Sequence, residues 1–241
     1  MTADLPVTTC RIATLNVWGL RGDWDARRQQ LRRGLFAVDA DILTLQEVVV
    51  TSGYDQPRDM VAEGYRLVHQ HDREPDGSGV TTASRWPIGD TFEVDLNVGP
   101  RTKDFACTSL VTEIVAPEPL GRLWVVNNLP DWQLDHEHER ELQAVRTAQT
   151  LERRRQAKPG HVIMAGDFDA EPSSSSLRFW TGRQSLGEMS VCYRSAWESA
   201  GKGRAETFAP DNPYSADWDR PFRQIDHILV RCGTHGGPTL R

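Results

Sequence analysis

The run HVIMAGDFDAEPSSSSL at residues 161–177 constrains the fold of this chain more than any other stretch. Its opening residues are mostly apolar and predict a buried strand, and two carboxylates, Asp167 and Asp169, follow where the backbone has to turn. Gly166 permits a close backbone approach at that turn, which a side chain would block. Because acidic groups at the end of a buried strand commonly support metal-assisted phosphate chemistry, the run predicts a strand that ends in a functional site.

Two further acidic residues share this arrangement. Glu47 ends the strand-like run DILTLQE, and Asp226 precedes the strand-like run HILV. Acidic groups at the edges of three buried strands are difficult to explain by solubility alone. We therefore expect these carboxylates to serve one site.

Composition is that of an ordinary globular protein. Of the 241 residues, 38% are hydrophobic and 26% are charged, which allows a sizeable core. No stretch has the apolar length of a membrane-spanning helix, and the N-terminus lacks a signal-peptide pattern, so the sequence predicts a cytoplasmic protein. Cys10, Cys107, Cys192 and Cys232 are scattered, which predicts reduced thiols rather than a zinc site or a disulfide framework.

Charge disfavours a dedicated nucleic-acid-binding protein. The net charge is −6, and the dense basic clusters at residues 27–33 and 153–155 lie in helix-like segments, where solvated helix faces are expected. A protein that holds duplex nucleic acid usually presents a basic face. The expected partner is a phosphorylated small molecule or an exposed phosphodiester; nucleic acid is possible but not favoured by charge, and no membrane partner is expected.

The chain reads as a single domain over residues 1–241, because no repeat, linker or change in composition divides it. Strand-like and helix-like runs interleave, as in folds that layer helices and sheets around one core. The longest helical run covers residues 134–157. The serines at 173–176 are expected to cap a following helix through their hydroxyls, and no G-x-S-x-G motif marks any of them as a nucleophile.

Short motifs at these strand ends resemble, in order, those of the endonuclease/exonuclease/phosphatase superfamily of metal-dependent phosphoesterases. They are Leu15-Asn16, Gln46-Glu47, Ser84-Arg85-Trp86-Pro87-Ile88, Gly166-Asp167-Phe168-Asp169 and Ile225-Asp226-His227-Ile228. Each motif alone is weak, but their shared order and compatible spacing, from residue 11 to about 231, are a strong indication. The resemblance implies an α/β (α+β) fold, a four-layered sandwich in which two mostly antiparallel sheets pack together and helices flank them.

The resemblance also implies roles for individual residues. Glu47 corresponds to the metal-binding glutamate, with Asn16 and Asp226 also at the metal, and Asp167 to the aspartate that positions or activates the attacking water. Asp169 stands where the family usually has an asparagine that contacts phosphate; an extra metal ligand and a plain loop residue are its alternatives. The implied cofactor is Mg²⁺ or Mn²⁺, since such ions accept few carboxylates and keep several waters.

Other residues receive weaker assignments. Arg85 is expected beside the cleft, within reach of phosphate, and Trp132 is expected to line a substrate pocket, although aromatic residues more often belong to the core. His227 is expected to pack rather than to act in catalysis. His136 and His138 point in different directions on a helix, so a solvated helix face is expected rather than a metal site.

Two departures from the family pattern affect the expected activity. Asn128 stands where the family has the histidine of N-x-H-L; it can donate a hydrogen bond to phosphate but carries no charge, so weaker transition-state stabilisation is expected. The terminal S-D-H motif does not follow Asp226, and the last strand of the sheet would be missing with it, which would leave an open edge. A chain cut short at Arg241 and a family member with reduced or lost hydrolysis are both compatible with this.

The expected function is hydrolysis of a phosphoester, of phosphodiesterase or phosphatase type, through a metal-polarised phosphate and an activated water. A DNA-processing nuclease of the same superfamily is one alternative. A catalytically impaired protein that binds a phosphorylated ligand is the other.

Overall fold

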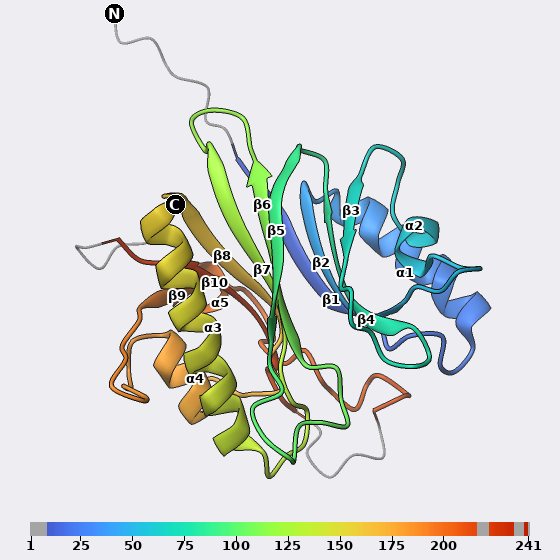
Figure 1. Ribbon diagram of the computed structural model, residues 1–241. Coiled ribbons are helices and arrows are strands. Elements are labelled where there is room, and N and C mark those ends of the chain that lie inside the picture. The colour runs from blue at the N-terminus through green and yellow to red at the C-terminus, as the bar shows by residue number, and fades with distance from the viewer. Residues whose placement is uncertain (1–8, 216–221, 234–238, 241) are drawn as a thin grey trace, which may run out of the picture.

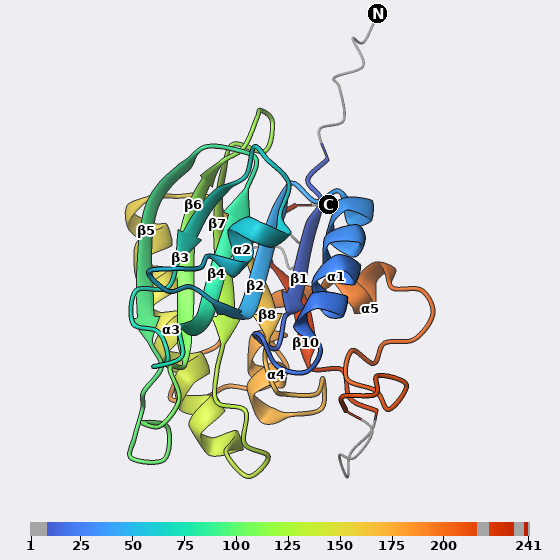
Figure 2. The ribbon, with the colours of Figure 1, turned by 90° about the vertical axis from the view of Figure 1, so that its right-hand side faces the viewer.

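The computed structural model describes residues 9–215, 222–233 and 239–240 (Figure 1). Two sheets pack face to face, with helices on both outer sides (Figures 1 and 2). This arrangement confirms the predicted four-layered sandwich of two mostly antiparallel sheets. None of the helices in the described part of the chain is both long and apolar enough to span a bilayer.

The smaller sheet has the order β1-β2-β4-β3 and consists of β1 (Ile12–Asn16), β2 (Ile42–Val49), β4 (Ser78–Ser84) and β3 (Arg66–His69). β1 and β2 are parallel, with Ile12 opposite Ile42 and Asn16 opposite Gln46, so both strands end at the same edge. No strand within the described residues pairs with the other side of β1, which is therefore an edge strand there.

The larger sheet has the order β5-β6-β7-β8-β10-β9. Its strands are β5 (Ile88–Asp95), β6 (Thr108–Val115), β7 (Arg122–Leu129), β8 (His161–Asp167), β10 (Asp226–Arg231) and β9 (Tyr193–Ser195). β7 and β8 are parallel and place Asn128 opposite Gly166, whereas β10 runs antiparallel and places Asp226 opposite Asp167. The ends of β7 and β8 and the start of β10 therefore share one edge.

Gly166 is required where these strands meet. A Cβ built at this position would lie 2.1 Å from the backbone oxygen of Asn128, much closer than atoms can approach. The close backbone approach predicted for this glycine is therefore present. It brings the end of β7 against the end of β8, next to Asp167.

Helices cover the outer faces of the sandwich. α1 (Trp24–Val38) and α2 (Gln56–Met60) lie over the smaller sheet, whereas α3 (Glu137–Ala157) and α4 (Ser175–Trp180) lie over the larger one; α5 (Ala196–Ala200) follows β9 (Figure 1). Among other residues, α3 buries Ala144, Ala148 and Leu151 in the core cluster that contains Trp124 and Met164. The predicted serine cap of α4 is wrong, because no serine hydroxyl makes a capping hydrogen bond at its N-terminus.

Candidate active site

Asn16, at the end of β1, connects two of the predicted site carboxylates. Its Nδ2 donates to Glu47 Oε1 at 2.8 Å and to Asp167 Oδ2 at 2.9 Å. Its Oδ1 accepts from the Trp18 backbone N–H at 2.9 Å, which fixes the orientation of the amide. One side chain therefore joins the ends of β1, β2 and β8, and with them the two sheets.

Glu47 lies in an irregular stretch of β2, where the register shifts between Leu45 and Val48. Its φ of 51° is left-handed, an unusual conformation for a residue other than glycine that costs roughly 1–3 kcal/mol. Its Oε2 lies 2.7 Å from Arg21 Nη1. Sequence reasoning did not identify Arg21, whose proximity to the carboxylate depends on the loop that follows β1.

Asp167 is buried, with 5% of its surface exposed. Its second oxygen accepts from the Asp169 backbone N–H at 3.0 Å, so both oxygens have fixed donors. Burial raises the pKa of Asp167 to about 6 and the charge of Glu47 adds to the shift, whereas hydrogen bonds from Asn16 and the Asp169 N–H oppose it. The site thus contains an oriented carboxylate that binds its proton more tightly than a free aspartate does.

Asp226 and Asp169 complete the acidic group. Burial, followed by the charge of Asp167, raises the pKa of Asp226 to about 8, and a hydrogen bond with Thr207 opposes this shift. Burial and the charge of Asp167 also raise the pKa of Asp169 well above its usual value, against the opposing charges of Arg223 and Arg140. Carboxylates that raise one another's pKa lack positive charge, and a bound cation would supply it.

The donor set fits a hard divalent cation. Glu47 and Asp167 offer carboxylate oxygens, and Mg²⁺ is commonly held by one or two carboxylates together with waters. Asn16 points its amide nitrogen at these carboxylates and its oxygen at the Trp18 N–H, so its predicted place at the metal stays a prediction. Within the described ranges, no group of three or more His, Cys, Asp or Glu side chains is arranged to hold a metal. Any Mg²⁺ or Mn²⁺ bound by these carboxylates would keep several waters as ligands.

A buried amide pair supports the site from behind. Gln46 Nε2 donates to Asn127 Oδ1 at 2.7 Å, and Asn127 Nδ2 donates to the carbonyl oxygens of Leu45 and Thr81. These bonds tie the larger sheet to β2 and β4, one residue before Glu47. They show why an asparagine and a glutamine are accommodated in an otherwise apolar interior.

Asn128 faces the other way, toward α3, as strand alternation requires. Its Oδ1 accepts from Ser109 Oγ at 2.6 Å, and Ser109 Oγ lies 3.0 Å from Thr147 Oγ1. The side chain also lines a small hollow with Arg140 and other residues. Its catalytic role stays a prediction.

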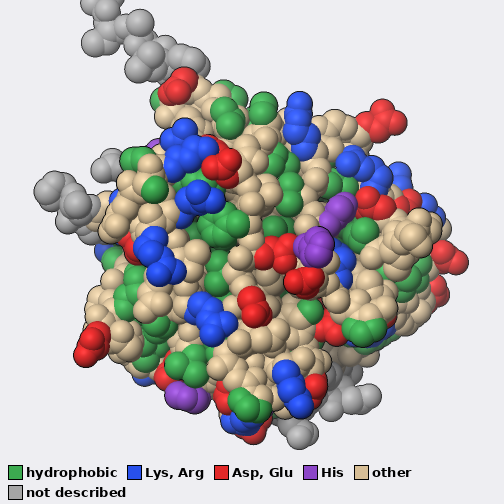
Figure 3. All heavy atoms as spheres, in the orientation of Figure 1, with side chains coloured by type: hydrophobic (Ala, Val, Ile, Leu, Met, Phe, Trp, Pro, Cys, Tyr) green, Lys and Arg blue, Asp and Glu red, His purple; other side chains and the backbone are tan. Residues whose placement is uncertain are grey.

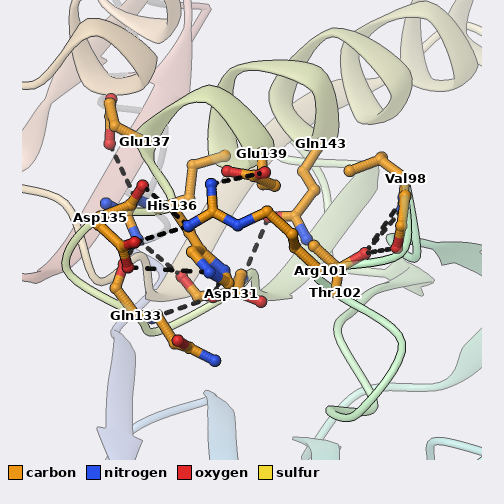
Figure 4. Close-up of polar contacts among 12 residues, drawn as sticks. Val98, Arg101, Thr102, Asp131, Gln133, Asp135, His136, Glu137, Glu139 and Gln143 are labelled. Atoms are coloured by element: carbon orange, nitrogen blue, oxygen red, sulfur yellow. Dashed lines mark hydrogen bonds and ion pairs between the residues drawn. The ribbon is translucent and has the colours of Figure 1, made fainter.

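A polar network fixes the loop between β7 and α3 (Figure 4). The Asp131 N–H donates to Gln143 Oε1 at 3.1 Å, and Arg101 pairs with Asp135 and Glu139 at 2.7 and 3.2 Å. Trp132, in this loop, is 45% exposed, so its indole is accessible. Its role in substrate binding stays a prediction.

The network also contains His136, for which the predicted solvated position is wrong. His136 is only 4% exposed, and its Nδ1 lies 2.8 Å from Asp131 Oδ1, because the loop folds back over the start of α3. His138 is exposed as predicted. His227 is buried as predicted, with Nε2 2.9 Å from the carbonyl oxygen of Ala170.

Arg85 lies away from the site, so the predicted contact between Arg85 and phosphate is wrong. Ser84, which precedes it, lies opposite Ile42 at the start of β2, whereas Glu47 lies near the other end. At about 3.3 Å per residue, that separation is roughly 17 Å, beyond the reach of an arginine side chain. Arg85 instead pairs with Asp39.

Two further basic residues contact the segments that carry the site residues. Arg223 is 7% exposed, and its Nη2 donates to the carbonyl oxygen of Asp169 at 3.1 Å, where the backbone is left-handed with a φ of 46°. Arg27 lies over the rings of Trp18 and Tyr214, 5.3 and 5.7 Å from their centroids, and so orders the loop after Asn16. Of these two residues, only Arg223 could have been suspected from the sequence, because it lies just before the Asp226 motif in the chain.

The profile of the Endonuclease/Exonuclease/phosphatase family matches residues 13–236. The chain belongs to this family. No curated protein matches it in sequence.

Solved structures support the same fold. Truncated Caenorhabditis elegans TDP2 is 16% identical, with a TM-score of 0.69 over 92% of this chain and 84% of that one. The human Nocturnin catalytic domain with bound sulfate anion is 17% identical, with a TM-score of 0.67 over 92% and 82%. ANGEL2, a 2′,3′-cyclic phosphatase, in complex with adenosine-2′,3′-vanadate is 14% identical, with a TM-score of 0.71 over 92% and 84%. At these identities, the likeness establishes the fold.

Surface charge adds one constraint. On the face shown in Figure 3, basic side chains are spaced apart, with acidic and uncharged surface between them. This face therefore offers no continuous basic track of the kind that duplex nucleic acid binds.

Proposed function

We propose that the protein is a Mg²⁺- or Mn²⁺-dependent phosphoester hydrolase that acts on small or exposed phosphoesters. The observation that carries this proposal is the pair of hydrogen bonds through which Asn16 holds Glu47 and Asp167 together, at 2.8 and 2.9 Å. Family membership supports hydrolysis of phosphoesters in general. The metal, the substrate and the roles below are the finer parts of the proposal.

Each residue of the group has a task that its contacts support. Glu47 would hold the cation, Asn16 would orient the Glu47 carboxylate through its amide nitrogen, and Asp226 would help to balance the charge. When bound, the cation polarises the phosphate and neutralises charge that develops in the transition state. Asp167, oriented by Asn16 and the Asp169 N–H, accepts a proton from the attacking water, since a pKa of about 6 leaves much of it ionised at neutral pH.

The structural relatives are consistent with this substrate class. ANGEL2 is described as a 2′,3′-cyclic phosphatase, and TDP2 from D. rerio has been solved with a single-strand DNA product. The acidic net charge of −6 favours a small or exposed ester over a duplex.

Hydrolysis of bis(4-nitrophenyl) phosphate with and without Mg²⁺ or Mn²⁺ tests the proposal. Asp167→Asn should lower kcat by roughly 10²–10⁴-fold, the usual contribution of a general base. Asp72→Asn is the matched control, because that side chain is 93% exposed. Hydrolysis that needs no metal, or an Asp167→Asn variant as active as the control, would contradict the proposal.

Binding of a phosphorylated ligand without turnover is the second candidate. Asn128, an uncharged residue where the family has a histidine, favours it. Metal-dependent binding of inorganic phosphate by a chain that hydrolyses no ester would select this function.

A further inference from the structure

A small hollow lies on the α3 side of the carboxylate group, between the ends of β7 and β8 and helices α3 and α4. Asn128, Arg140 and Ser176 are polar residues in its wall, and Phe168 and Trp180 are apolar ones. Its volume is about 10 Å³, which is the space of one water or one phosphoryl oxygen. The hollow therefore has room for about one oxygen atom.

Ser176 supplies a hydroxyl without a protein partner. The residue is 4% exposed, and its Oγ is buried without a hydrogen bond. Buried polar groups are nearly always bonded, because an unsatisfied one destabilises the fold. Because Ser176 lines the hollow, an oxygen held there would give this hydroxyl a partner.

Arg140 supplies a charge next to that hydroxyl. It is 5% exposed; its Nη1 donates to the carbonyl oxygens of Asp131 and Gln133, and its Nε donates to Glu137. Its Nη2 makes no hydrogen bond with another described residue, so a donor remains available.

Glu137 fixes Arg140 and Ser176 relative to each other. Its Oε2 accepts from Arg140 Nε at 2.8 Å, and its Oε1 accepts from the Ser176 backbone N–H at 2.8 Å. Because each oxygen already has a donor, the carboxylate stabilises the hollow without competing for the same ligand. Such prearranged donors lose little freedom when a ligand binds.

Asn128 connects the hollow to the reaction site. It lies opposite Gly166 in the β7–β8 ladder, one residue before Asp167. Its Oδ1 is engaged by Ser109 Oγ, which leaves Nδ2 as the donor. Phe168, the next residue after Asp167, forms part of the same wall.

We infer that Asn128, Arg140 and Ser176 form a binding site for one oxygen of the phosphoester, in which Arg140 supplies the positive charge that Asn128 lacks. The inference rests on the proposed function and deepens it. Donors prearranged around an oxygen that gains negative charge stabilise the transition state more than the ground state. Arg140 and Ser176 belong to none of the sequence motifs.

Ser176→Ala tests the site, because it removes an unpartnered hydroxyl and should leave folding intact. Ser173→Ala, an exposed serine of the same run, is the matched control. We expect kcat/KM for bis(4-nitrophenyl) phosphate, and the affinity for inorganic phosphate in the presence of Mg²⁺, to fall about threefold to tenfold in Ser176→Ala only. Calorimetry gives the phosphate affinity independently of turnover, and thermal unfolding confirms that both variants fold.

Arg140→Lys provides a second readout. Lysine keeps the charge, but its single ammonium group cannot donate to the carbonyl oxygens of the loop and to a ligand in the hollow at the same time. We expect phosphate binding to weaken at least as much as in Ser176→Ala.

Failure of this inference is distinguishable from failure of the proposed function. Hydrolysis and phosphate binding that match wild type in Ser176→Ala and Arg140→Lys would overturn the role of the hollow in binding phosphate while leaving the proposed function intact. A wild-type chain without hydrolysis, whose phosphate binding still weakens in Ser176→Ala, would reject the hydrolase but support the hollow. A wild-type chain that neither hydrolyses the ester nor binds phosphate would overturn both.

Discussion

Asn16 Nδ2 and Asp167 Oδ2 lie 2.9 Å apart, although 151 residues separate them in the chain. The hydrogen bond joins the last residue of β1 in the smaller sheet to the last residue of β8 in the larger one. The orientation of the candidate base therefore depends on how the two sheets pack. A change in that packing would alter the site without changing any residue in it.

Removing the Asn16 amide should reduce activity. Asn16→Ala deletes donors to two carboxylates, and a hydrogen bond to a charged group contributes about 1.5–3 kcal/mol, so kcat/KM should fall at least roughly tenfold. Ester hydrolysis in the presence of Mg²⁺ measures the effect. Asn97→Ala, at an exposed position, should match wild type. Equal activity in the two variants would exclude an orienting role for Asn16.

Stability should fall as pH rises when no divalent cation is present. The folded-state pKa of Asp226 is about 8, above its usual value of 3.8, so between these values the folded state binds more protons than the unfolded state. The free energy of unfolding therefore decreases across this range, and its loss is complete above about pH 8. Thermal unfolding in a chelator measures this, and Asp226→Asn should flatten the dependence.

A divalent cation should reverse this trend. Mg²⁺ binds the ionised carboxylates, so it should raise the melting temperature more at about pH 8 than at about pH 5. An equal rise at both pH values would show that the carboxylates do not hold the ion.

The strand ends could be predicted from sequence because an apolar run with an acidic residue at one end is a local pattern. Glu47, Asp167 and Asp226 were identified in this way. Arg85 was misplaced because β4 runs antiparallel to β2, so the motif at its end lies at the opposite edge of the sheet. The sequence order of motifs does not reveal that direction.

Contacts between helices were less predictable. Ser176 and Arg140 lie on α4 and α3, and only the tertiary packing of these helices brings both to Glu137. His136 was misassigned for a similar reason, since its burial comes from the preceding loop. Periodicity describes the faces of one helix and contains no information on what a loop covers.

Arg21 should compete with the cation for Glu47. Its Nη1 lies 2.7 Å from Glu47 Oε2, and the side chain is 51% exposed, so it can move into solvent. We expect Arg21→Ala to strengthen Mg²⁺ binding a few-fold, because an exposed ion pair contributes about 0–1 kcal/mol. Calorimetric titration with Mg²⁺ measures this, and Glu47→Gln should weaken binding in the same experiment. Weaker binding in Arg21→Ala would show that Arg21 supports the cation instead.

The close approach of β7 and β8 should make Gly166 intolerant of any side chain. In Gly166→Ala the new Cβ would lie 2.1 Å from the Asn128 backbone oxygen, and two central strands would have to separate. Such overpacking costs about 1–3 kcal/mol or more, and chemical denaturation should show a loss of at least that size. Gly34→Ala is the matched control, because its Cβ meets nothing within 4 Å and the residue lies inside α1. That control should gain about 0.5–1 kcal/mol, as alanine does over glycine within a helix. If Gly166→Ala were as stable as Gly34→Ala, the strand ends that carry Asn128 and Asp167 would not be as closely packed as the structure places them.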